Sequence, residues 1–352
     1  MSRYKQKIRE NIKLLFYFYF FRDFRPIVPI IWIYLSAKLG SYAIAMSYLS
    51  MIMIFSALFE VPTGIFSDKI GRKRTLMLAA LLSCGESIIY IIAHNIQNNV
   101  YYLYILAALF RGFTISMYSG TDQALSYESL ASLKKSHKFH VFGGKLISMV
   151  AFSYGIACLV GGILGEISFL WVFYINLFAQ IITLSISQFL VEPNNVKRSE
   201  ERSLKHFIIS FKYMIRNKRL KNLSIGTIIE NGFGNVSMEF RQVFLKTIVP
   251  IWLIGFTRFL RYILGGISFW FSGKVIDKFG YFKVIISVTI LSKIIAIFAV
   301  LLASILTPFI FILNTSIRAP YHTAMEALMQ KEYKHKQRAT MGSIVSFFKT
   351  IF

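Results

Sequence analysis

The chain has 352 residues, of which 55% are apolar, 16% aromatic and only 16% charged, and its net charge is +24. Soluble domains carry about 25% charged residues, so a soluble globular protein of this composition is excluded. Apolar runs of roughly 18 or more residues recur, and they are continuous rather than alternating. This excludes a transmembrane β-barrel and predicts an all-α polytopic membrane protein.

Six membrane spans are predicted in the first half of the chain, at residues 14–35, 42–65, 76–93, 100–122, 146–164 and 169–191. A polar stretch, 192–221, follows with nine Lys and Arg residues and predicts a cytoplasmic linker between two domains, 1–191 and 222–352. Apolar residues recur every three to four positions from Leu204 to Ile215, which predicts an amphipathic helix on the inner leaflet. A solvated linker is the alternative.

Four further spans are predicted at residues 223–244, 251–271, 284–303 and 306–325, and an eleventh begins near Ala339. The eleventh run is shorter than the ~20 residues of a full crossing. We therefore expect about 10 to 11 transmembrane helices and an incomplete second bundle.

The basic residues are distributed very unevenly between the loops. Of the 40 Lys and Arg residues, 29 fall on one set of alternate loops, eight lie inside spans, and three (Lys38, Arg241 and Lys246) fall on the opposite loops. Such asymmetry orients a protein of the cytoplasmic (inner) membrane and places its N-terminus in the cytoplasm. The asymmetry also explains the net positive charge without a role in nucleic-acid binding, because such binding would require a basic face on a soluble element.

An internal repeat links the two halves of the chain. Three residues after the second span recur after the eighth at a constant offset of 209 positions: Gly64, Asp68 and Gly71, and then Gly273, Asp277 and Gly280. The chain has only four Asp residues, and two of them occupy this position. Parallel halves related in this way are an architecture of membrane transporters.

The stretch from Gly64 to Arg74 resembles the loop signature of the major facilitator superfamily, and the weaker copy from Gly273 to Lys283 lies where that family places its second. The residues Phe59 to Thr63, Arg111-Gly112, Ser119 to Asp122 and Glu192-Pro193 are also similar to bacterial members. The resemblance implies two six-helix bundles and secondary active transport of a small organic solute by alternating access, as in bacterial multidrug and metabolite transporters.

The resemblance also implies that the repeated loop is a conformational gate. Gly64 and Gly71 permit tight turns and close helix contacts, and Asp68 can cap a helix N-terminus. Arg72 and Lys73 can form ion pairs with Asp122 or Glu128 in one conformation and release them in the other. The same gating role is expected for the second copy of the motif, which contains Gly273, Asp277 and Gly280. The alternative is that the cluster serves membrane topology alone.

Proton-coupled efflux is the expected activity. The fifth span departs from the family's antiporters, because Ala157-Cys158 replace the expected Gly-Pro pair, although Gly161 and Gly165 can still pack closely. Uptake of an anionic metabolite and an inactive truncated fragment are the alternatives.

Ionisable residues inside spans are candidates for substrate and proton binding, because each costs roughly 3 kcal/mol to insert. The candidates are Arg22, Asp23, Arg25, Arg111, Glu230, Arg258 and Arg318. Seven deep cations (these arginines with Arg261 and Lys293) face four deep carboxylates (Asp23, Glu86, Glu230 and Glu239), an excess of three. This favours an anionic or zwitterionic solute on Arg22, Arg25 and Arg111, with Asp23 or Glu230 carrying the coupling proton. The alternative is internal neutralisation.

The remaining expectations are absences and partners. The sequence contains no nucleophile elbow, phosphate loop or metal-spaced His and Cys cluster, so we expect no enzyme activity, no cofactor and no metal. The expected partners are a small solute, protons and the lipid bilayer, and the expected state is a monomer.

Overall fold

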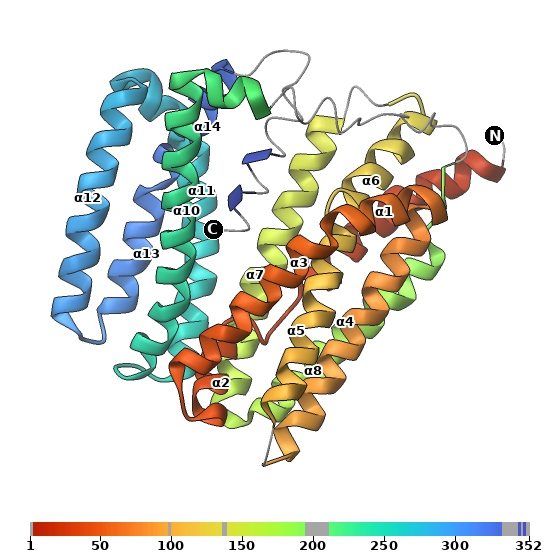
Figure 1. Ribbon diagram of the computed structural model, residues 1–352, viewed down its shortest axis with the longest axis horizontal. Helices are drawn as coiled ribbons and strands as arrows, with labels where there is room; N and C mark the ends of the chain where they lie inside the picture. The colour runs from red at the N-terminus through yellow and green to blue at the C-terminus, as the bar shows by residue number, and fades with distance from the viewer. Residues whose placement is uncertain are drawn as a thin grey trace. The chain divides into compact units, whose positions relative to one another are not determined.

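The computed structural model describes residues 3–97, 100–135, 139–193, 211–332, 344–345 and 348–349. Its described residues form helices joined by short connections, and no strand occurs among them. The chain divides into two compact units, Met1–Arg198 and Ser199–Phe352, which are described separately. Figure 1 shows the helices of each unit running side by side as bundles.

The N-terminal unit contains eight described helices: α1 (Arg3–Asp23), α2 (Ile31–Leu39), α3 (Tyr42–Ile70), α4 (Arg72–Asn95), α5 (Tyr101–Tyr118), α6 (Thr121–Ser132), α7 (Phe139–Ile167) and α8 (Phe169–Phe189). Helix α5 packs against α3 and α4, α8 packs against α4 and α1, and α7 also packs against α1. The buried core at one end is formed by apolar side chains from several of these helices, among them Leu15, Leu76, Leu125, Leu146 and Leu190.

The C-terminal unit contains α10 (Lys218–Lys246), α11 (Ile251–Phe279), α12 (Tyr281–Leu302), α13 (Thr307–Ile317) and α14 (Ala319–Glu332) among its described residues. Helices α11 and α12 both pack against α13 and α14, and α10 packs against α14 and α11. Residues 211–216 are also helical. Most of the predicted amphipathic helix, residues 204–210, lies outside the described residues.

The repeat seen in the sequence extends to whole helices in the structure. Helices α3 and α11 are both 29 residues long, and their ends are separated by the same 209 positions as the motif, 42 to 251 and 70 to 279. Each ends at a glycine with positive φ, Gly71 at 100° and Gly280 at 79°, and a new helix starts at the next residue. Because such backbone angles favour glycine, the repeated glycines fix an abrupt change of direction in each unit.

Two predicted spans, the first and the tenth, are interrupted, which corrects their predicted continuity. The first divides into α1 and α2 at a turn that contains Pro26 and Pro29, where the backbone amide needed by a helix is missing. The fourth predicted span, 100–122, corresponds to α5, and a second helix, α6, begins after Gly120, whose φ is 69°. The tenth divides into α13 and α14 at Arg318. The breaks place polar backbone beside the ionisable residues discussed below.

Gly161 of α7 allows the first of these breaks to be packed tightly. A Cβ at this position would lie 2.0 Å from the carbonyl oxygen of Pro26, so only a glycine fits here without displacement. The small residue predicted for close packing therefore contacts the loop between α1 and α2.

By length and composition, five described helical segments are apolar enough to cross a membrane: Tyr42–Glu60, Arg72–Asn95, Lys145–Ile167, Phe169–Phe189 and Tyr281–Leu302. Helices α10 and α11 are also long, but they carry several charged residues along their length. The ionisable residues are therefore concentrated in a subset of helices, and these helices position the candidate site.

Candidate functional site

The start of α4, directly after the loop from α3, is capped by a carboxylate from near the C-terminal end of the N-terminal unit's sequence. The backbone amides of Arg72 and Lys73 donate hydrogen bonds to Oε1 and Oε2 of Glu192, at 2.8 and 2.7 Å. These are the first amides of α4, which have no partner within the helix, and the negative charge also meets the positive end of the helix dipole. The sequence predicts Asp68 as the capping carboxylate; the structure places Glu192 at the start of α4, and the Asp68 side chain lies outside the described residues.

Gly71 is needed here for a second reason besides its backbone angle. A Cβ on Gly71 would lie 3.2 Å from the carboxylate atoms of Glu192, so a larger residue would press on the cap. Gly64, by contrast, lies exposed on α3, and a Cβ there would meet nothing within 4 Å.

The side chain of Arg72 bridges three helices. Its Nη1 donates to Oγ of Ser67 on α3 at 2.9 Å, and its Nε lies 3.7 Å from Oε1 of Glu128 on α6. Ser67 Oγ also accepts a hydrogen bond from Thr121, the first residue of α6. Of the two carboxylates predicted for this loop, Glu128 is therefore beside Arg72, whereas Asp122 binds Arg22 of α1.

The second copy of the motif is far more open. A Cβ added at Gly273 or at Gly280 would meet no atom within 4 Å, and Asp277 lies exposed on α11. The two copies share backbone geometry, but the close carboxylate cap is described for the first copy only.

Arg22 and Asp23, at the end of α1, form a charged cluster with α6. The Arg22 guanidinium binds Oδ2 of Asp23 and, through Nη1, Oδ2 of Asp122 at 2.5 Å. It also lies over the rings of Tyr19 and Tyr118, at 4.4 and 5.2 Å from their centroids. Two carboxylates and two aromatic faces therefore surround this one cation.

Arg25 and Glu86 form a buried ion pair between the α1–α2 turn and α4. Arg25 Nη2 donates to both carboxylate oxygens, at 2.7 and 2.8 Å, and the side chains are only 3% and 1% exposed. Nε and Nη1 of Arg25 are buried with no hydrogen-bond partner among the described residues. A buried guanidinium with unused donors has the capacity to bind a further acceptor.

Arg111 lies half-buried on α5, where α5 approaches α3 closely. At the neighbouring Gly112 a Cβ would lie 2.6 Å from Phe55 Cβ and 2.8 Å from the backbone nitrogen of Ser56. The two helices therefore touch through their backbones at the level of Arg111.

In the C-terminal unit, Glu230 of α10 forms an ion pair with Arg318 at the break between α13 and α14. Their side chains are 24% and 27% exposed, so this pair is more accessible than Arg25 and Glu86. The two residues come from separate predicted spans, and the sequence had no signal that would pair them.

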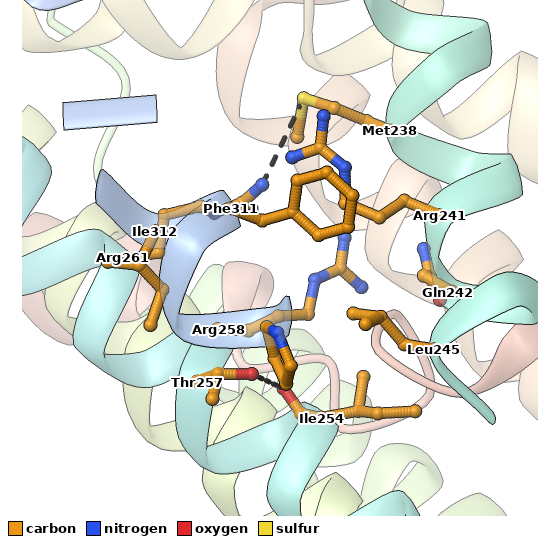
Figure 2. Close-up of a pocket in the computed structure, with 11 residues that line it drawn as sticks. Met238, Arg241, Gln242, Leu245, Ile254, Thr257, Arg258, Arg261, Phe311 and Ile312 are labelled. Atoms are coloured by element: carbon orange, nitrogen blue, oxygen red, sulfur yellow. Dashed lines mark hydrogen bonds between the residues drawn. The ribbon is translucent and has the colours of Figure 1, made fainter. Parts of the chain in front are cut away.

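A pocket of about 40 Å³ lies between α10, α11 and α13 in the same unit, space for a few water molecules. Figure 2 shows Arg241, Arg258 and Arg261 converging around the ring of Phe311. The Arg241 guanidinium lies 4.1 Å from that ring centroid. Of these three, Arg258 was a predicted candidate, whereas Arg241 was counted with the outer loops although it falls near the end of the predicted span 223–244; it lies on α10. The signal that could have found it is its place three residues from the end of the apolar run.

Comparison with known proteins identifies the family. The family model of the Major Facilitator Superfamily matches residues 14–352. No curated protein sequence matches the chain.

Solved transporter structures share the fold. A mutant of the nucleoside transporter NupG has a TM-score of 0.80 at 14% identity, covering 98% of this chain and 89% of that one. A bacterial homologue of the human lysosomal transporter Spinster has 0.73 at 15%, covering 100% and 80%. A D-xylose–proton symporter has 0.62 at 13%, covering 100% and 88%. The chain therefore belongs to the Major Facilitator Superfamily and is a multi-pass secondary transporter rather than an enzyme.

Proposed function

We propose that the chain moves a small organic solute across the cytoplasmic membrane by alternating access, coupled to protons and directed outward. The observation that carries the coupling is the set of carboxylates held against arginines inside the bundles: Asp23 and Asp122 on Arg22, Glu86 on Arg25, and Glu230 on Arg318. In such an ion pair, the charge of the carboxylate stabilises the conformation in which the arginine lies beside it.

Protonation changes the balance between conformations. A carboxylate that takes up a proton loses its charge and leaves its arginine uncompensated in a low-dielectric surrounding. The conformation in which that arginine meets another anion or water then becomes favoured. We assign the proton to Glu230, because its side chain is 24% exposed while that of Glu86 is 1% exposed and tightly bound.

The loop between α3 and α4 supports the alternating-access part of the proposal. Arg72 reaches Ser67 and Glu128, and Glu192 holds the start of α4, so three separate helices end in one polar cluster. Breaking this cluster would free the ends of these helices together. A two-state element of this kind is what a gate requires.

The test uses protein reconstituted into liposomes with an imposed pH gradient. The trial solutes are uridine, D-xylose, succinate and glucose 6-phosphate, and proton movement is followed with an entrapped pH-sensitive dye. The Glu230→Gln variant is expected to lose gradient-driven accumulation by at least tenfold while keeping solute exchange at equal pH. Glu332→Gln, which alters an ion pair with the largely exposed Arg219, is the control. Wild-type accumulation by Glu230→Gln would refute the assignment.

A second candidate function is uptake of an anionic metabolite, which the three arginines of the α10–α11–α13 pocket favour. The two functions differ in direction. Efflux predicts accumulation in inverted membrane vesicles with an acidic interior, whereas uptake predicts accumulation in right-side-out vesicles placed in acidic medium. The names of the structural neighbours do not decide the solute, because identities of 13–15% establish the fold alone.

A further inference from the structure

His94 joins two helices at the end of α4 that lies opposite the loop between α3 and α4. It is the second-last residue of α4, and its side chain is partly exposed. Its carbonyl oxygen accepts a hydrogen bond from Nζ of Lys38 on α2 at 2.8 Å, and its Nδ1 lies 3.2 Å from the hydroxyl oxygen of Tyr34 on the same helix. The imidazole also stacks on the Tyr34 ring, with the centroids 5.7 Å apart. One histidine therefore bonds two residues of α2 to α4.

A second tyrosine fixes the direction of the hydrogen bonds in this cluster. Tyr104 of α5 is fully buried, and its hydroxyl oxygen lies 2.9 Å from that of Tyr34, which is its only hydrogen-bond partner among the described residues. When Tyr104 donates to Tyr34 and Tyr34 donates to Nδ1 of His94, every hydroxyl hydrogen has an acceptor. We therefore assign to His94 the neutral tautomer that carries its hydrogen on Nε2.

A proton on Nδ1 of His94 would reverse this chain of hydrogen bonds. His94 would donate to Tyr34, Tyr34 would donate to Tyr104, and the hydroxyl hydrogen of Tyr104 would be buried without an acceptor, which is costly. The imidazolium would also add a second positive charge beside the Lys38 ammonium, which acts on His94 electrostatically. Both effects disfavour the bonded arrangement of α2 and α4 once His94 is charged.

The remaining groups around His94 do not offset this charge. From α8, the ring of Phe173 meets the imidazole edge-on, with the centroids 5.9 Å apart. One turn earlier on α4, Tyr90 shares a hydrogen bond with a tyrosine of α3. Glu86, about two turns earlier, already forms the buried ion pair described above. In the part of the chain that the structure describes, Lys38 is therefore the charged group that acts on His94.

Helix α2 is short and is bounded by two sites at which the backbone can bend. It has nine residues, Ile31–Leu39, and follows the turn that contains Pro26 and Pro29. It ends at Gly40, whose φ is 68°. Residues at the ends of an element absorb the changes of backbone angle when that element moves. Loss of the bonds to α4 can therefore move α2 as a unit.

We propose that His94 is a second proton-binding site of this transporter, in addition to Glu230, and that its protonation releases the end of α2 from α4. His94 takes up one proton from solvent, its ring then carries hydrogen on both nitrogens, and the proton returns to solvent when α2 closes again. The part that this movement plays in transport rests on the proposed function, whereas the binding of the proton does not. With the predicted orientation this end of the unit faces outside, where protons enter a proton-coupled exporter.

The first experiment follows the histidine directly. The purified chain is labelled with carbon-13 at histidine Cε1 and placed in nanodiscs, and its NMR signals are recorded from about pH 4.5 to 8.5. The signal that is missing from His94→Gln belongs to His94 and is expected to titrate between about pH 5 and 7. In Lys38→Gln it is expected to titrate at a higher pH, because the neighbouring charge is gone. A His94 signal that stays constant over this range would overturn the proposal.

The second experiment follows the movement of α2. Leu35 is fully buried, so Leu35→Cys in a Cys84→Ser, Cys158→Ser background reports opening through its rate of reaction with a water-soluble maleimide. Dividing this rate by that of the same chain with His94→Gln at each pH removes the pH dependence of the thiol itself. The ratio is expected to rise at least about fivefold as the pH falls through the His94 titration. His322→Gln, at the other histidine whose side chain is described, is the control and should keep the response.

Transport assays separate the failure of this proposal from failure of the proposed function. Flux of the same trial solutes in liposomes is compared between wild type and His94→Gln at several pH values on the side of His94, and His94→Gln is expected to flatten the pH profile. Titration of His94 and movement of α2 without flux of any solute would uphold the proton site and refute transport. Flux that falls in Glu230→Gln as expected, in a chain whose Leu35→Cys ratio stays constant with pH, would do the reverse.

Discussion

At the scale of single residues, charges inside the bundles are compensated by partners far along the chain. Arg25 and Glu86 are separated by 61 positions, and Arg22 and Asp122 by 100. The sequence predicted which residues would be placed at an energetic cost, because insertion penalties depend on residue type. It left open whether they would pair internally or bind solute, because the pairing depends on helix packing that no local pattern encodes.

Arg25→Gln is expected to lower the free energy of unfolding by about 3–5 kcal/mol, because Glu86 would remain buried without its counterion. The double variant Arg25→Gln with Glu86→Gln should recover most of that loss, since neither buried charge is then present. Denaturant unfolding of the purified protein in mild detergent measures both. A double variant no more stable than Arg25→Gln would show that the pair is not the source of the cost.

At the scale of helices, the repeat was the most predictive feature of the sequence. The constant offset of the two motifs indicated equivalent positions, and α3 and α11 agree with it at both ends. The breaks in the first and tenth spans have local signals in the sequence. Pro26 marks the first, and Pro320, two residues after Arg318, marks the tenth, because a proline has no amide hydrogen to donate to the residue four positions earlier.

Gly161→Ala tests the close approach of α7 to the turn at Pro26. The added Cβ would fall 2.0 Å from a backbone carbonyl, so we expect a loss of about 1–3 kcal/mol as the helices move apart. Gly226→Ala on α10 is the matched control, because a Cβ there meets nothing within 4 Å. That variant should gain up to about 1 kcal/mol from helix propensity. Equal effects of the two substitutions on thermal unfolding would contradict the packing explanation.

At the scale of the whole molecule, the family match establishes a secondary transporter of the Major Facilitator Superfamily, as the composition, the repeat and the loop motif predicted. The orientation in the membrane stays a prediction from the charge asymmetry. Cysteine labelling from outside the cell is expected to reach Gln97→Cys, after α4, and to miss Lys135→Cys, after α6. Both positions are exposed, so the reverse pattern would invert the topology.

Solute flux is expected to depend more strongly on the first copy of the loop motif than on the second. Asp68→Asn removes a charge without changing size, and we expect normal membrane insertion with solute flux reduced at least tenfold. Asp277→Asn should reduce flux less, because Asp277 lies exposed beside an open glycine. Flux in liposomes, normalised to the amount of inserted protein, measures both. Wild-type flux by Asp68→Asn would leave the motif a role in topology alone.

The length of α3 has a consequence for the conditions under which the gate operates. Its 29 residues make a helix about 44 Å long, whereas the hydrocarbon core of a membrane is about 30 Å thick, so one end of α3 extends beyond the core. With the span beginning near Tyr42, we expect the ion pair of Arg72 with Glu128, which follows the end of α3, to lie outside the hydrocarbon core. The side chains of this pair are 19% and 13% exposed, against 3% and 1% for Arg25 and Glu86, so dissolved ions should screen it more than they screen the buried pair. Transport should thus respond to the salt concentration on the side of this loop more strongly than the fold does.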